Sequence, residues 1–174
     1  MRCVDVNVLV YAHRPESPDH ERYAAWLEAV RAGDEPLAVP RLCLSGFLRI
    51  VTHPRVFRDP TPMAVALDFA EGVGSSPNHL PVVPGERHWE IFTRLCRSAE
   101  VVGNVVPDAY LAAMAIERGA TLCTTDRGFG RFAGLRWTHP FDDAPAPGGP
   151  AERPGRHGHA PSERRRAGRV GRTG

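Results

Sequence analysis

The chain has 174 residues, of which 42% are hydrophobic, and a formal net charge of +2. This length suffices for one domain with a hydrophobic core. The sequence contains no run of about 18 apolar residues, which excludes a transmembrane helix, and its N-terminus lacks the segments of a signal peptide. We therefore expect a cytoplasmic protein with no membrane partner.

Composition divides the chain into a body, residues 1–143, and a tail, residues 144–174. The tail is rich in Pro, Gly and Arg, with seven arginines against two glutamates and one aliphatic residue, Val170. Such a segment cannot build a core, so we predict that it is disordered. Two interpretations of the tail remain open. Its positive charge would attract nucleic acid, and alternatively the tail is a non-functional extension.

The body opens with RCVDVNVLV, residues 2–10, which reads as a central strand buried on both faces. One carboxylate, Asp5, interrupts this apolar run, and burying it alone would cost several kcal/mol. We therefore expect Asp5 beside a cation or at the open end of the sheet. In a strand, Asn7 would project from the same face as Asp5.

Helical and strand patterns alternate through the rest of the body. Hydrophobic spacing predicts helices over residues 19–31, 42–52, 61–73, 85–98 and 108–118. Short apolar segments predict strands over 36–39, 80–83, 121–124 and 135–137. This alternation indicates an α/β fold with a mainly parallel sheet.

Three aspartates are then expected at one edge of that sheet. Asp5 is near the end of the first strand, Asp126 follows the strand at 121–124, and Asp108 begins the helix leading into that strand. In open parallel sheets, sites form beyond the carboxyl ends of the strands. Taken singly, Asp108 could serve only the helix macrodipole, and Asp126 could be an ordinary turn residue.

Three neighbouring carboxylates repel one another unless a cation neutralises them. Oxygen ligands without Cys or an obligatory His favour Mg²⁺, or Mn²⁺, as the cofactor. Such a site suits phosphodiester hydrolysis by metal-activated water. A small-molecule phosphatase is disfavoured, because that class needs a second acidic group two residues after the first, where this chain has Asn7.

Several separated motifs resemble a PIN-domain ribonuclease, and more narrowly the VapC-type toxins of type II toxin–antitoxin systems. They are DVNVLVYA at 5–12, GFLRIVTHPRVF at 46–57, and VPDAYLAAMAIERGATLCTTDRGFGRF at 106–132. The resemblance covers residues 1 to about 140 and not the tail.

The resemblance implies a three-layer α/β/α fold and a Mg²⁺-dependent endoribonuclease that forms homodimers and is blocked by a small cognate antitoxin. It assigns Asp5, Asp108 and Asp126 as catalytic metal ligands, and Asn7 and Thr125 as residues that support them. It leaves the RNA-binding residues unassigned. Arg49, Arg55 and Arg127 are candidates for holding the RNA backbone.

Two positions depart from the family pattern. Many members carry a glutamate near Ser45 and Gly46, where this chain has none, and similar sequences often have an acid in place of Gly128. Because ligand charge sets the affinity for hard cations, both departures predict weaker metal binding. The alternative hypothesis is therefore a catalytically weakened PIN-like module that binds RNA or a partner.

Overall fold

A parallel sheet forms the centre of the fold in residues 1–142, the part of the chain that the computed structural model describes. Its five strands lie in the order β3-β2-β1-β4-β5, and every neighbouring pair is parallel. The strands are β1 (Arg2–Val4), β2 (Leu37–Ala38), β3 (His79–Leu80), β4 (Thr121–Cys123) and β5 (Arg136–Thr138). The predicted disordered tail, 144–174, lies outside the described residues.

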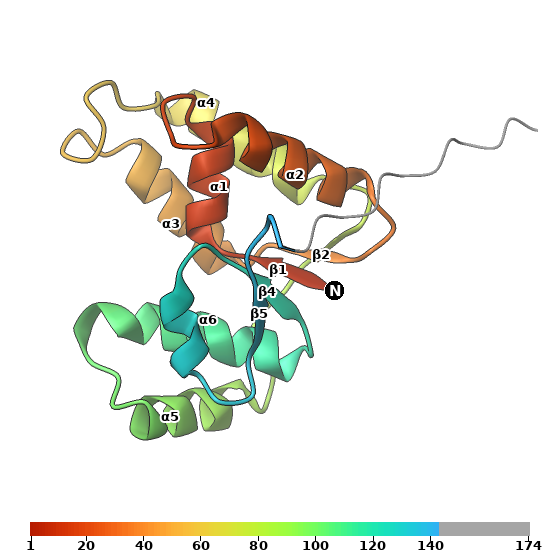
Figure 1. Ribbon diagram of the computed structural model, residues 1–174, viewed down its shortest axis with the longest axis vertical. Helices are drawn as coiled ribbons and strands as arrows, with labels where there is room; N and C mark the ends of the chain where they lie inside the picture. Colours follow the sequence, from red (N-terminus) through yellow and green to blue (C-terminus); the bar gives the residue numbers. More distant parts are fainter. Residues whose placement is uncertain (143–174) are drawn as a thin grey trace, which may run out of the picture.

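Helices cover both faces of this sheet (Figure 1). The helices α1 to α4 lie on one side, and α5 and α6 lie on the other. Their bounds are α1 (Val6–His13), α2 (His20–Ala32), α3 (Arg41–Val51), α4 (Met63–Gly74), α5 (His88–Ser98) and α6 (Val106–Glu117). The predicted three-layer α/β/α fold with a parallel sheet is confirmed. None of these helices is long and apolar enough to cross a membrane.

The prediction of one strand over residues 2–10 is wrong. The strand β1 ends at Val4, and the helix α1 begins at Val6. A short apolar run does not distinguish a buried strand from a buried helix, because both hide every side chain. Here α1 is enclosed by α2 and α3, so Val8, Leu9 and Val10 are all buried.

The topology places the carboxyl ends of β1 and β4 at a switch point. From β1 the chain crosses to β2 on one side, and it later returns to β4 on the other. Parallel α/β sheets bind ligands at such a point, where connections diverge and leave a crevice. The residues that directly follow β1 and β4 are Asp5 and Thr124.

Candidate active site

Asp5 joins β1 to α1 and serves as the N-cap of that helix. Its extended backbone lets the side chain fold back, and the Val6 N–H donates a hydrogen bond to Asp5 Oδ1 at 2.6 Å. Only 4% of Asp5 is exposed. A carboxylate at an N-cap is favoured by the free amides and by the helix dipole. The helix therefore supplies part of the stabilisation that a buried Asp5 needs.

The second oxygen of Asp5 is held by Thr124. Register pairs Val4 with Cys123, so the next residues, Asp5 and Thr124, lie side by side. The fully buried Thr124 hydroxyl donates to Asp5 Oδ2 at 2.7 Å, and it accepts from Asn7 Nδ2 at 3.2 Å and from the Asp126 N–H at 3.0 Å. A hydroxyl has one donor position and two acceptor positions. All three are occupied here, so the Thr124 side chain is fixed in this geometry.

The contact of Asn7 with Thr124 gives it a supporting position, although it lies on α1 and not on a strand as predicted. Thr125, the other predicted supporting residue, contributes its backbone N–H, which lies 3.4 Å from Asn7 Oδ1. The hydroxyl that reaches Asp5 belongs to Thr124 instead. Only the strand register distinguishes the two threonines.

Asp108 approaches the same site from α6. Pro107 occupies the first turn of this helix, where its missing N–H costs nothing, and Asp108 follows in the same turn. The next residue, Ala109, is fully buried against the core. This packing anchors the start of α6, so that Asp108 stays half-buried at the surface of the site.

Asp126 lies close to these two carboxylates but has a local partner. It caps the short 3₁₀ helix at Arg127–Arg131, and its Oδ1 accepts a hydrogen bond from the Gly128 N–H at 2.6 Å. A Cβ atom on residue 128 would lie 2.8 Å from that oxygen. Glycine at 128 thus permits the capping geometry, which corresponds to the turn role considered for Asp126.

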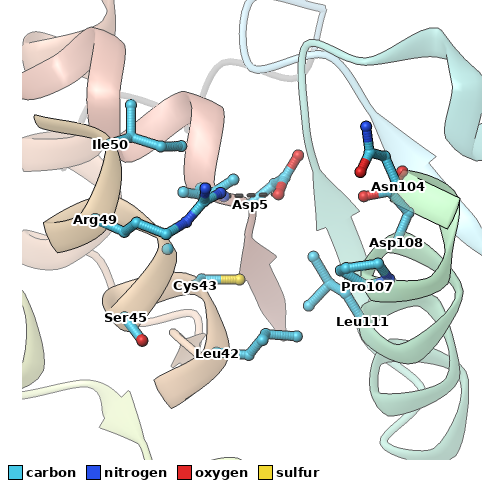
Figure 2. Close-up of a pocket in the computed structure, with 12 residues that line it drawn as sticks. Asp5, Leu42, Cys43, Ser45, Arg49, Ile50, Asn104, Pro107, Asp108 and Leu111 are labelled. Carbon is cyan, nitrogen blue, oxygen red and sulfur yellow. Dashed lines mark hydrogen bonds between the residues drawn. The ribbon is translucent and has the colours of Figure 1, made fainter. Parts of the chain in front are cut away.

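An open pocket of about 540 Å³ brings Asp5 and Asp108 together. Asp5 lies between its walls, with Asp108 and Asn104 on one side and α3 on the other (Figure 2). Arg49 lines the pocket from α3, whereas Asp126, Arg55 and Arg127 are not among its lining residues.

Charge repulsion and burial act together on these carboxyls. Burial raises the pKa of Asp5, and the Asp126 charge adds to this rise, while hydrogen bonds from Thr124 and Val6 oppose it. Burial, with the charges of Asp5 and Asp126, raises the pKa of Asp108 from 3.8 to about 6. The site therefore concentrates negative charge that a cation would relieve.

A basic residue that sequence reasoning missed also acts here. The Arg131 charge lowers the pKa of Asp108, against the larger effect of burial. Its Nε donates to the Gly128 carbonyl at 2.9 Å, which holds the side chain near the turn. The sequence carries no signal for this placement, because it depends on how the 3₁₀ helix folds back.

The donor set fits a hard divalent cation that retains water ligands. In residues 1–142, no group of three or more His, Cys, Asp or Glu side chains could hold a metal ion. Mg²⁺ needs fewer, because one or two carboxylates, with water and substrate phosphate, complete its coordination. Asp5 and Asp108 supply such a pair. Cys43 also lines the pocket, but burial raises its pKa and keeps it a neutral thiol, a poor metal ligand.

Comparison with known proteins identifies the family of this chain. Residues 2–135 match the PIN domain. The chain belongs to the PIN-domain family. It is 46% identical over 142 residues to VapC ribonuclease Mb2897 of Mycobacterium bovis, covering 82% of this chain and 97% of that protein. It is 41% identical over 140 residues to ribonuclease VapC25 of Mycobacterium tuberculosis, covering 80% and 99%.

Solved structures agree on the PIN fold. VapBC2 from Rickettsia felis, bound to a DNA fragment from its promoter, gives a TM-score of 0.61 at 19% identity, covering 79% of this chain and 97% of that chain. VapBC-1 from nontypeable Haemophilus influenzae gives 0.59 at 16% identity, covering 80% and 98%. The chain is thus a VapC-type PIN-domain protein in sequence and fold.

The structure also shows at which position of α3 in this PIN domain an acidic side chain would fit. A Cβ on residue 46 would approach Val6 Cγ2 to 3.2 Å, so Val6 must shift by a few tenths of an ångström to admit a side chain there. Ser45, by contrast, is exposed and lines the pocket. A carboxylate on this stretch of α3 would therefore fit at Ser45 more easily than at Gly46.

Proposed function

We propose that this PIN-domain protein is a Mg²⁺-dependent endoribonuclease that acts as the toxin of a type II toxin–antitoxin pair. The observation that carries the proposal is the pairing of buried Asp5 with Asp108 in an open pocket at the switch point of the sheet. The ribonuclease names of relatives that are 41–46% identical support it.

Each site residue has a distinct role in this proposal. Asp5 and Asp108 would hold Mg²⁺, which when bound supplies a Lewis acid and a source of hydroxide at neutral pH. Thr124 fixes the orientation of Asp5, and Asn7 orients Thr124. Asp126 would contribute charge to the same site. No side chain in the pocket needs to act as a nucleophile, since water attacks the phosphodiester.

We further propose that a small cognate antitoxin binds this protein and that the protein forms homodimers. The structural neighbours VapBC2 and VapBC-1 support the antitoxin. Co-purification with the product of an adjacent small reading frame, followed by mass measurement of the complex and of the free toxin, tests both partners.

The test of the activity is digestion of total cellular RNA by purified, antitoxin-free protein. Discrete fragments that require Mg²⁺, disappear with EDTA and are absent with Asp5→Asn support the proposal, and their ends identify the target. RNA binding without cleavage, unchanged by Asp5→Asn, would favour the weakened module instead. The absence of an acid at Ser45 and Gly46 motivates that second candidate.

A further inference from the structure

One wall of the pocket carries a positive charge. The residues that α3 contributes are spaced three and four apart, so they form one face of the helix. Arg49 is the charged residue among them, and the central residues are small. They are Leu42, Cys43, Ser45, Gly46, Arg49 and Ile50. The α3 wall of the pocket therefore presents a cation to the carboxylates Asp5 and Asp108.

The charge of Arg49 is available to a ligand. Its side chain is exposed, and it forms no hydrogen bond, ion pair or ring contact with any residue in 1–142. Arg14, by contrast, is already engaged, because it binds Glu16 and Thr61 and stacks on the Phe57 ring. Arg49 thus lines an acidic pocket without being neutralised by it.

Figure 2 shows Arg49 reaching from α3 toward Asp5, with Asp108 and Asn104 on the opposite side. A group seated between these walls meets carboxylates on one side and a guanidinium on the other. A phosphodiester suits this position, because its anionic oxygens match the planar fork of arginine. The carboxylates alone would repel it, and an opposing cation on α3 offsets part of that repulsion.

We propose that Arg49 binds a phosphate of the RNA substrate next to the carboxylate pair, an inference that rests on the proposed function. Arg49 acts here as a hydrogen-bond donor and a fixed charge. Neither Arg55 nor Arg127 lines the pocket, so the geometry points to Arg49 among the three arginines considered from the sequence.

RNA binding without cleavage tests this directly. In an Asp108→Asn background with EDTA, we expect Arg49→Ala to weaken RNA binding about 10-fold and to lower the salt slope by about 0.7, the value of one phosphate contact on a single strand. The matched control is Arg41→Ala, an exposed arginine on the same helix that does not line the pocket. We expect Arg41→Ala to change the RNA-binding affinity by less than about twofold, since a peripheral charge contributes little.

Single-turnover cleavage supplies the second readout. Arg49→Ala should slow cleavage about 100-fold at saturating Mg²⁺, and Arg49→Lys should recover only part of this, because lysine keeps the charge but loses the fork. Equal binding and equal cleavage by the Arg49→Ala and Arg41→Ala variants would overturn the inference. If the wild-type protein cleaves no RNA, the proposed function fails, while the binding comparison still decides whether Arg49 holds phosphate.

Discussion

Burial of the Asp108 carboxylate, together with its repulsion by Asp5 and Asp126, should cost stability, and removing its charge should therefore stabilise the metal-free protein. The pKa of Asp108 is raised from 3.8 to about 6. Between these values the folded protein binds a proton that the unfolded chain has lost, so stability falls as pH rises through this range and stays lower above it. The pKa change corresponds to about 3 kcal/mol, which screening at this half-exposed group reduces to about 1–2 kcal/mol.

Urea unfolding of the wild type and Asp108→Asn, both in EDTA, measures this cost. At pH 7.5 we expect the variant to be more stable by about 1–2 kcal/mol, and the difference should shrink as pH falls from about 6 toward 4. Asp68→Asn, at an exposed position on α4, is the matched control. Equal stability of the wild type and Asp108→Asn at pH 7.5, or a difference independent of pH, would refute the electrostatic reasoning.

Three further substitutions test the surroundings of the pair. Thr124→Val should lower the free energy of unfolding by about 1–3 kcal/mol, because it leaves Asp5 Oδ2 buried without a donor. Thr124→Ser keeps the hydroxyl and should retain most of the wild-type stability. Asp126→Ala should cost about 1 kcal/mol through the lost cap. Asp126→Asn should keep that stability yet reduce RNA cleavage if the Asp126 charge serves the site, and unchanged cleavage would assign it to capping alone. Gly46→Ala should be more favourable for stability in a Val6→Ala variant than in the wild type, with a coupling energy of about 1 kcal/mol from urea titrations; additive effects would contradict the contact.

Sequence patterns predicted the elements whose two faces differ, and they failed where both faces are buried. The helices near 20–32 and 41–51 carry apolar stripes, and the structure confirms them within two residues at each end. In the segment from Val6 to Val10 the only polar residue is Asn7, and Val8, Leu9 and Val10 are all buried because α1 is enclosed by its neighbours. Its helical start was nevertheless signalled by Asp5, a favoured N-cap residue.

The site was predictable to the extent that topology determines it. Residues that end parallel strands, and residues that begin the helices between them, meet at one edge of the sheet, which is why Asp5 and Asp108 could be placed together from the strand and helix pattern alone. The choice of Thr124 over Thr125 depends on strand register, and the approach of Arg131 depends on a turn. Neither strand register nor turn geometry leaves a periodic pattern in the sequence, so the roles of Thr124 and Arg131 could be found only from the structure.

The most direct test of the central claim is the Mg²⁺ dependence of RNA cleavage, with unfolding temperature recorded on the same samples. We expect the cleavage rate and the unfolding temperature of the wild type both to rise with Mg²⁺. Asp5→Asn and Asp108→Asn should lose both responses, while Asp68→Asn should keep them. Cleavage that persists in EDTA, or a Mg²⁺ response that survives in the Asp5→Asn and Asp108→Asn variants, would contradict the assignment of this carboxylate pair.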